Sequence, residues 1–315
     1  MERRTQQATQ KETRPKYMDM HMHTNYSDGV SVSPRQLVST CALRGMDLIA
    51  ITDHDSFRGY EEAKRAGDDF GITVLPGTEI TTPNYHLLAL NFDPTNKAFG
   101  DFIAHSRELQ EKTCERRIEL LRDVGIPITL RKVKRIFPES RLGKVNIIVA
   151  MTQDQGCRAY MQEKHPEMTP RQVQYHYMGD GGIASGIDKY GVTEPEAIDA
   201  VHRAGGLIGV AHAVKDIPDI DALPKRALGF IPELDELLNK GIDFVEVQPA
   251  LGLMGKYLYQ TVMVSEWIKN NNLPIVYGSD YHGPVITDRE LLKRDDNILS
   301  ENTRDMLNRG YQQID

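Results

Sequence analysis

Short apolar runs alternate with amphipathic stretches along the first hundred residues, a pattern typical of strands separated by helices. The run from Met46 to Thr52 is rich in apolar residues, as a strand buried on both faces of a parallel sheet requires. Ser33-Pro34 is typical of an N-cap and a first helical turn, and Gly45 of a helix end. The pattern predicts helices at 34–45 and 57–70 and strands at 19–23, 46–52, 72–76 and 85–91.

The last third of the chain repeats this alternation. Thr193-Glu-Pro-Glu196 is a capping box with proline in its first turn, so it predicts a helix that runs to Gly205. Further strands are predicted at 207–212, 242–248 and 274–280, and an amphipathic helix at 257–272. We therefore predict an α/β fold with parallel strands, in which ligands gather at the carboxyl ends of the strands.

The middle of the chain has a different pattern. Residues 97–124 form a long polar helix pattern that ends at Gly125, and a mixed helical stretch follows. We predict a mostly helical insertion at 94–192 that caps the active site, between two segments of the α/β fold at 17–93 and 193–315. The basic cluster at 131–135 is interpreted as a solvated helix face rather than a phosphate site. His105, His165, His176 and His202 are predicted to be structural or exposed.

Composition and charge narrow the class of protein. The 315 residues are 40% hydrophobic and 26% charged, which is ordinary for a globular protein with a large core. A net charge of −7 argues against a general nucleic-acid binder, although it permits a local basic pocket for one phosphate. Three scattered cysteines, Cys41, Cys114 and Cys157, suggest reduced thiols in a cytoplasmic protein. Residues 1–16 are predicted to be a disordered tail without a signal segment, and no apolar run is long enough for a membrane span.

Histidines and carboxylates collect at the predicted strand ends. His21 and His23 lie on one face of a strand because side chains alternate with period 2. Buried imidazoles and carboxylates cost free energy unless they are paired or bind metal, so packing alone explains such a set poorly. No cysteine joins it, and a mixed set suits two or three Zn²⁺, Mn²⁺ or Fe²⁺ ions rather than a structural zinc site. The nine predicted metal ligands are His21, His23, Asp28, His54, Glu79, His86, His212, Asp280 and His282.

These residues stand in short motifs that resemble a known family. In order along 19–283, the motifs Asp19-x-His21-x-His23, Thr52-Asp-His-Asp55, Gly77-x-Glu79, Ala211-His212 and Gly-Ser-Asp280-x-His282-Gly resemble those of the PHP (polymerase and histidinol phosphatase) superfamily. The insertion before His212 is similar to that of the branch containing nucleoside 3′,5′-bisphosphate and AMP phosphatases. The resemblance implies a distorted (β/α)7 barrel with a helical insertion domain and two or three metal ions at the barrel mouth.

The resemblance also implies roles for individual residues. One ion would be held by His21, His23, Glu79 and Asp280, a second by Glu79 with His86 and His212, and a third by Asp28, His54 and His282. A metal-bridged hydroxide would attack phosphorus, and His212 or His282 would serve as general acid. Three further carboxylates are expected to fix imidazole tautomers, namely Asp19, Asp53 and Asp55.

The predicted substrate side of the site departs from the family pattern. Relatives carry an Arg-Pro-His-Phe-Ala segment where this chain has Lys144-Val-Asn146-Ile-Ile, so Asn146 replaces an imidazole. The usual Ala-His-Pro is Ala211-His212-Ala213 here, followed by Lys215. The candidates for substrate binding are Arg141, Lys144, Asn146 and Lys215.

Several functions fit this pattern. The leading one is metal-dependent hydrolysis of a small phosphate ester, such as a nucleotide or sugar phosphate. A cyclic phosphodiesterase acting on a phosphoribosyl cyclic phosphate is the first alternative, because a tethered leaving group tolerates loss of the extra histidine. Histidinol phosphatase and a non-catalytic metal-binding PHP module are further alternatives. A proofreading nuclease is disfavoured by the net charge, and we expect no membrane or stable nucleic-acid partner.

Overall fold

Seven strands form one sheet in the order in which they occur along the chain. The structure is a computed structural model that describes residues 17–27, 30–179, 181–184, 190–216, 231–248, 258–283 and 298–314. Asp28 therefore lies outside the described residues. The strands are β1 (Met18–Asp19), β2 (Leu48–Ile51), β3 (Thr73–Thr81), β4 (His86–Leu90), β5 (Leu207–Val210), β6 (Phe244–Val247) and β7 (Ile275–Tyr277).

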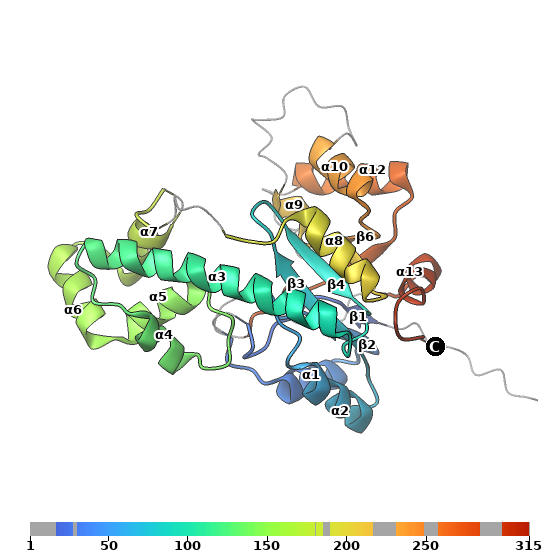
Figure 1. The fold of residues 1–315 in the computed structure, drawn as a ribbon, viewed down its shortest axis with the longest axis horizontal. Helices are drawn as coiled ribbons and strands as arrows, with labels where there is room; N and C mark the ends of the chain where they lie inside the picture. Colours follow the sequence, from blue (N-terminus) through green and yellow to red (C-terminus); the bar gives the residue numbers. More distant parts are fainter. Residues whose placement is uncertain are drawn as a thin grey trace, which may run out of the picture.

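The first and last strands meet, so the sheet is a nearly closed barrel. The amide of Met20 donates to the carbonyl of Tyr277 at 2.8 Å, and the amide of Asp280 donates to the carbonyl of His21 at 2.8 Å. A parallel bridge joins Met22 to Tyr281 just beyond β1 and β7. The predicted α/β barrel is confirmed, and its closure brings the motifs at the two ends of the chain together (Figure 1).

One strand contradicts the prediction of parallel strands. β4 is antiparallel to both β3 and β5, whereas the other neighbouring pairs are parallel. The connection from β3 to β4 is a short hairpin, too short for the crossover that parallel strands need. The reversal places the first residue of β4, His86, opposite Thr81 at the end of β3. His86 therefore reaches the barrel mouth from the start of its strand.

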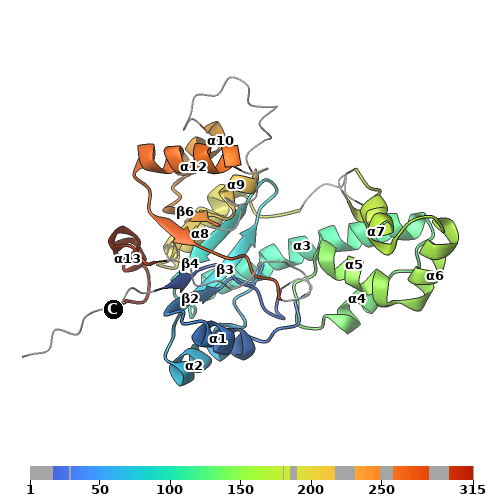
Figure 2. The same ribbon diagram turned by 180° about the vertical axis from the view of Figure 1, so that it is seen from behind.

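Helices cover the barrel on opposite sides (Figures 1 and 2). α1 (Pro34–Leu43) and α2 (Tyr60–Phe70) pack together on one side, and Ser33 caps α1 as its sequence predicted. The other side is covered by α8 (Glu194–Arg203), α10 (Pro232–Lys240) and α12 (Leu258–Asn271), with Trp267 of α12 buried in the shared core. Two short helices, α9 (Ala213–Asp216) and α13 (Glu301–Leu307), also belong to the barrel part of the chain. The barrel interior is filled by apolar side chains that include Met20, Leu75, Leu88 and Phe244.

The middle segment extends away from the barrel as a group of helices (Figure 2). Its helices are α3 (Lys97–Asp123), α4 (Leu130–Ile136), α5 (Lys144–Gln153), α6 (Gln155–Lys164) and α7 (Pro170–Met178). Residues 114–184 contribute a hydrophobic cluster of their own, with Leu121, Ile147 and Met151 fully buried. α3 joins both parts, because Phe99 and Ile103 pack in the barrel-side core and Cys114 and Ile118 in the insertion core. The limits 94 and 192 stay a prediction.

Two simpler expectations can be compared with the structure. The basic cluster at 131–135 lies on α4, where Lys132 pairs with Asp154 at 2.8 Å and Lys134 pairs with Glu111, as on a solvated helix face. The three cysteines are free and buried. Among the described residues, no helix has the length and apolar composition that crossing a membrane demands.

Candidate metal centre

A fully buried carboxylate, Glu79 of β3, lies at the centre of the barrel mouth. Its Oε1 is 2.8 Å from His86 Nδ1 and 3.0 Å from His212 Nε2. Its Oε2 is close to the rings of His21 (3.0 Å), His54 (3.1 Å) and His23 (3.3 Å). Five imidazoles from β1, β2, β4 and β5 or the loops after them therefore converge on one carboxylate, with two on one oxygen and three on the other.

A second carboxylate extends the set from β7. Asp280 Oδ1 lies 3.6 Å from His21 Nε2, 3.4 Å from His23 Nε2 and 3.3 Å from His282 Nδ1. Potential ligand atoms lie within 4.8 Å of one another in three groups among the described residues. These groups are His21, His23, Glu79 and Asp280; His54, Glu79 and His86; and His23, His54 and His282. We call the eight residues Glu79, Asp280 and the six histidines 21, 23, 54, 86, 212 and 282 the mouth cluster.

The backbone turns sharply where several of these residues leave their strands. Of five non-glycine residues with positive φ in the described chain, three stand at the mouth: Asp55 (φ 46°), His212 (φ 34°) and Asp280 (φ 54°). Such a backbone is uncommon for residues with a Cβ and is concentrated at functional sites, where surrounding contacts hold it. The positive φ values therefore indicate that contacts of these residues at the mouth outweigh the conformational cost of their backbone.

Glu246 of β6 is a site residue that the sequence analysis missed. It is fully buried, its Oε2 lies 3.1 Å from His21 Nδ1, and it also accepts a hydrogen bond from the His212 amide. A Cβ on Gly278, the residue after β7, would meet Glu246 Oε1 and would lie 2.5 Å from His21 Cβ, so this position needs glycine. The available signal was an acidic residue inside the apolar run Phe-Val-Glu-Val.

The carboxylates expected to fix imidazole tautomers have other contacts. Asp19 accepts from the amides of His21 and Ser279, at 3.2 and 3.0 Å, so it ties β1 to the loop after β7. Asp53 accepts from the amide and hydroxyl of Thr24, both at 2.6 Å. Among the described residues the expectation for Asp19 is not met, because the amides of His21 and Ser279, rather than a ring, reach its Oδ1.

Asp55 also departs from that expectation. It binds Thr81, Ser106 and Arg141 rather than an imidazole. The groups that do meet the far nitrogens of the rings are the hydroxyl of Ser27, 3.1 Å from His23 Nδ1, and the carboxylate of Glu246 at His21.

The electrostatics of the mouth cluster favour bound cations. Burial alone would raise the pKa of Glu79, yet His54, His21 and His86 hold it well below its usual range. Burial opposes protonation of His23, but hydrogen bonds to Asp280 and Glu79 raise its pKa to about 9. The pKa of His21 is likewise raised against burial by Glu79, Glu246 and Asp280. Three buried carboxylates thus stabilise positive charge at the same point.

The donor set fits divalent metal ions. Imidazole nitrogens and carboxylate oxygens without a thiolate suit Zn²⁺, Mn²⁺ or Fe²⁺, and a carboxylate with ligands on both oxygens suits a position between two ions. Metal binding requires neutral imidazoles, so the ions would replace the protons that these carboxylates otherwise stabilise. The cluster therefore provides chemistry for a centre of more than one ion.

Solvent reaches only one side of the cluster. The side chains of His21 and His23 are 0% exposed, whereas those of His86, His212 and His282 are 35%, 11% and 15% exposed. A group that transfers a proton to a substrate must be accessible, and His212 and His282 meet that condition. The predicted pair of general-acid candidates thus lies on the open rim.

The candidate substrate residues are placed differently from one another. Arg141 is buried and pairs with Asp55, so its guanidinium already has an internal partner. Lys144 begins α5, and Asn146 in the same turn is fully buried with Oδ1 accepting from the Gly143 amide at 2.8 Å. Asn146 Nδ2 is buried without a hydrogen-bond partner among the described residues. Lys215 lies in α9 after Ala213, and its side chain is outside the described part.

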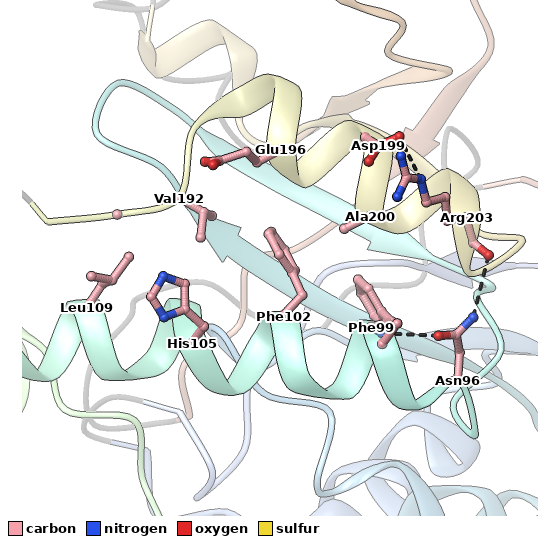
Figure 3. Close-up of a pocket in the computed structure, with 12 residues that line it drawn as sticks. Asn96, Phe99, Phe102, His105, Leu109, Val192, Glu196, Asp199, Ala200 and Arg203 are labelled. Atoms are coloured by element: carbon pink, nitrogen blue, oxygen red, sulfur yellow. Dashed lines mark hydrogen bonds and ion pairs between the residues drawn. The ribbon is translucent and has the colours of Figure 1, made fainter.

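A separate groove of about 580 Å³ lies between α3 and α8 (Figure 3). Phe99, Phe102 and Leu109 line it, and three of its polar residues have partners within the fold. Asp199 pairs with Arg203 at 3.0 Å, and Glu196 accepts from the Thr193 amide at 2.8 Å. None of the mouth cluster lines this groove.

Comparison with known proteins gives consistent results. Residues 19–123, from β1 to the end of α3, match the PHP domain family. The chain is 27% identical to a 5′-3′ exoribonuclease of Haemophilus influenzae over 273 residues, covering 85% of this chain and 91% of the relative. It is 24% identical over 273 residues to a phosphoribosyl 1,2-cyclic phosphate 1,2-diphosphodiesterase of Eggerthella lenta, covering 84% and 94%.

A shorter match and a solved structure extend this comparison. Over 95 residues the chain is 33% identical to a 3′,5′-nucleoside bisphosphate phosphatase of Chromobacterium violaceum, covering 29% and 33% of the two chains. A Bifidobacterium adolescentis structure, provisionally assigned as a metal-dependent phosphoesterase, is 25% identical with a TM-score of 0.67 and covers 94% and 98%. Residues 19–123 thus match the PHP domain family, and the chain over most of its length is similar to a phosphodiesterase and to a structure provisionally assigned as a metal-dependent phosphoesterase.

Proposed function

We propose that this protein hydrolyses a phosphate ester of a small phosphorylated metabolite, a nucleotide or sugar phosphate, with divalent metal ions at the barrel mouth. The observation that carries the proposal is the convergence of five imidazoles on the two oxygens of buried Glu79. A single structural ion would need four ligands, and here Asp280 and His282 come in addition.

The proposed ligand sets follow the geometry. His21, His23, Glu79 and Asp280 would hold one ion, and Glu79 Oε1 with His86 and His212 a second. His54 and His282 would contribute to a third, together with Asp28. When bound, the ions would supply a nucleophile from water at neutral pH and neutralise charge on the phosphoryl group.

The protein's own groups would orient the ester and move a proton. His212 and His282 stand on the accessible rim, and as an alternative to binding an ion, one of them would donate a proton to the leaving oxygen. The N-terminus of α5 carries Lys144, and its N-cap Gly143 has no capping side chain. Backbone amides at a helix start favour a phosphate, so this turn is the proposed substrate-phosphate contact.

That turn is close to the predicted ligand loop after β1. The Arg141 amide donates to the Tyr26 carbonyl at 2.9 Å, and Ser140 Oγ donates to the Asn25 carbonyl at 2.9 Å. Residues 140 and 141 therefore contact the loop that follows His23, and the chain continues from them into the first turn of α5. The buried Nδ2 of Asn146 supplies a further donor in that turn.

A cyclic phosphodiester is the second candidate substrate. The Eggerthella lenta relative, which is named for a cyclic phosphate, aligns over nearly its whole length. A cyclic ester keeps its leaving oxygen tethered, so an amide at Asn146 would suffice where other relatives have an imidazole. The Haemophilus influenzae relative is named an exoribonuclease, so an RNA end is a further substrate to test. A net charge of −7 does not prevent this, because an RNA end needs only a local binding site.

The test identifies the hydrolysis products after reconstitution with Mn²⁺: inorganic phosphate from a monoester, the ring-opened monoester from the cyclic ester, and mononucleotides from RNA. Four substrates are compared: a nucleoside 3′,5′-bisphosphate, AMP, phosphoribosyl 1,2-cyclic phosphate and a 5′-phosphorylated oligoribonucleotide. We expect turnover of the open monoesters, and turnover of only the cyclic ester would select the second candidate. Release of mononucleotides from the RNA alone would replace both with an exonuclease.

Metal removal distinguishes an enzyme from a non-catalytic metal-binding module. We expect the chelated protein to remain folded and to be inactive, with activity restored by Mn²⁺. Unfolding on chelation, with no turnover of any substrate by the metal-loaded protein, would instead support a structural role for the ions.

A further inference from the structure

Asp55, the residue after the predicted ligand His54, is held from several sides. It is 0% exposed, and its Oδ1 accepts from the Thr81 amide at 3.0 Å and from Ser106 Oγ at 2.7 Å. Its own amide donates to the Glu79 carbonyl at 2.9 Å. Asp55 is thus bonded to β3 at Glu79 itself and two residues beyond it, at Thr81, with its backbone at a φ of 46°.

The remaining oxygen of Asp55 faces a cation from the insertion. Arg141 Nε lies 3.2 Å from Asp55 Oδ2, and the side chains are 7% and 0% exposed. Arg141 Nη2 also donates to Thr81 Oγ1 at 2.9 Å. Because both charges are buried, loss of either would remove the charged partner that the other has in this pair, which a folded protein tolerates poorly.

The same short segment contacts the loop after β1. The Arg141 amide and the Ser140 hydroxyl donate to the carbonyls of Tyr26 and Asn25, each at 2.9 Å. Residues 140 and 141 therefore touch the chain beyond His23, beyond His54 and beyond Glu79. These three predicted ligands come from three different strands or the loops after them.

α3 supports the segment from behind. Arg107 Nη2 donates to the carbonyls of Glu139 and Ser140 at 3.0 and 2.8 Å, while the preceding residue, Ser106, binds Asp55. α3 is a single 27-residue helix that packs in both hydrophobic cores. Movement of the insertion would therefore be transmitted to Asp55.

We propose that Arg141 is a positioning residue for the metal centre, acting through Asp55 on His54 and Glu79 rather than by contact with substrate. The inference rests on the proposed function, because it treats the mouth cluster as metal ligands. It gives the insertion a role in metal binding through its contact with the ligand loops.

Two variants test the role of the Arg141–Asp55 pair. Arg141→Lys keeps the charge but replaces the planar guanidinium, whose Nε and Nη2 donate separately to Asp55 and Thr81, by a single ammonium nitrogen. Ser106→Ala removes one hydrogen bond to Asp55 without leaving a buried charge alone, so it remains informative if Arg141→Lys does not fold. Groups that orient ligands typically change metal affinity about 10- to 100-fold, and we expect losses of that size for Mn²⁺ titrated into the apoprotein.

Kinetics distinguish positioning from substrate contact. We expect the Mn²⁺ concentration for half-maximal activity to rise in both variants, and activity to recover at saturating Mn²⁺. KM for the best substrate of the panel should stay unchanged at saturating Mn²⁺. A raised KM that Mn²⁺ does not restore would overturn the proposal and assign Arg141 to the substrate.

Glu139→Gln is the matched control. It weakens the exposed 2.8 Å ion pair with Arg58, which also joins the insertion to the barrel but does not touch Asp55. Its Mn²⁺ affinity should stay within about twofold of the wild type, as expected for an exposed pair. An equal loss in this control, or wild-type affinity in both test variants, would refute the assignment.

Hydrogen exchange in the metal-free protein separates this inference from the proposed function. Peptides covering residues 76–82 contain the Thr81 amide, which should exchange faster in both test variants and at the wild-type rate in Glu139→Gln. If the wild type bound no Mn²⁺, the proposed function would fail while the exchange result still judged the Arg141–Asp55 link. An unchanged exchange rate of the Thr81 amide in both test variants would refute the positioning role of Arg141.

Discussion

The barrel mouth and the insertion hold their polar groups in different ways. At the mouth, Glu79, Glu246 and Asp280 are gathered with six histidines, at a cost in desolvation that packing does not require. In the insertion, side-chain oxygens such as those of Thr129 and Asp154 cap helices above an apolar core. The mouth concentrates buried charge, whereas these two capping groups of the insertion are satisfied by backbone amides three residues along the chain. The difference identifies where the reaction is expected.

Removing one imidazole from each region gives the largest expected contrast. His54→Ala should lower metal-dependent phosphate release by more than about a hundredfold while the protein stays folded, because it deletes a predicted ligand. The control is His165→Ala in the insertion, where the ring bonds Tyr177 at 2.8 Å. Phosphate release and circular dichroism measure both variants. Near-wild-type turnover of His54→Ala would remove His54 from the metal centre.

Truncating one leucine in each core tests whether the two regions fold together. Leu121→Ala in the insertion and Leu88→Ala in the barrel each remove a fully buried side chain and should cost about 2–5 kcal/mol. Because α3 runs through both cores, we expect one transition in urea. Fluorescence of Trp267 reports the barrel side, and far-ultraviolet circular dichroism reports all helices. Separate midpoints for Leu121→Ala would show that the insertion unfolds by itself.

Metal binding at the mouth should release protons. Hydrogen bonds to Asp280 and Glu79 raise the pKa of His23 to about 9, so its ring is protonated in the metal-free protein at pH 7. A ligand imidazole must be neutral, so affinity should rise with pH, by about tenfold per unit for each proton released, until pH approaches that pKa. Calorimetry of Mn²⁺ binding in two buffers of different ionisation enthalpy measures the release. Identical heats in both buffers would contradict it.

The smallest expected effect is an acid-sensitive pair in the insertion. The hydrogen bond from Lys132 lowers the pKa of Asp154 to about 2, below its unfolded value. The stabilisation is therefore complete above about pH 4 and is lost as pH falls towards 2. Lys132→Met should cost up to about 1 kcal/mol at pH 7 and much less at pH 2, as judged by urea unfolding. A cost independent of pH would mean that Lys132 acts through packing.

Much of the fold could be predicted from short-range pattern. Ser33 begins a helix as its Ser-Pro pattern indicated, and Thr193 begins one as its capping box indicated. The apolar runs before His54 and His212 are strands. These features depend on neighbours within a few residues, so the sequence carries them directly. The direction of β4 was not predicted, because strand direction depends on which neighbour it pairs with and on the hairpin before it.

The residues of the candidate site also divide into those that the sequence predicted and those that it could not. Motif spacing was sufficient to name His21, His23, His54, Glu79, Asp280 and the other described members of the mouth cluster. It could not reveal Glu246, because the contact of Glu246 with His21 depends on the pairing of β6 with β7. It also depends on Gly278, which lies against both side chains. Nor could it reveal that Arg141 pairs with Asp55, 86 residues away.

The sequence by itself determined which metal-binding residue types the chain contains. It also determined that they lie at strand ends, since strand positions follow from local periodicity. Only the tertiary structure decided that five imidazoles share one carboxylate and that Arg141 has a buried partner. Those outcomes depend on barrel closure and on the packing of α3, and such contacts form between residues whose separation along the chain leaves no periodic signal.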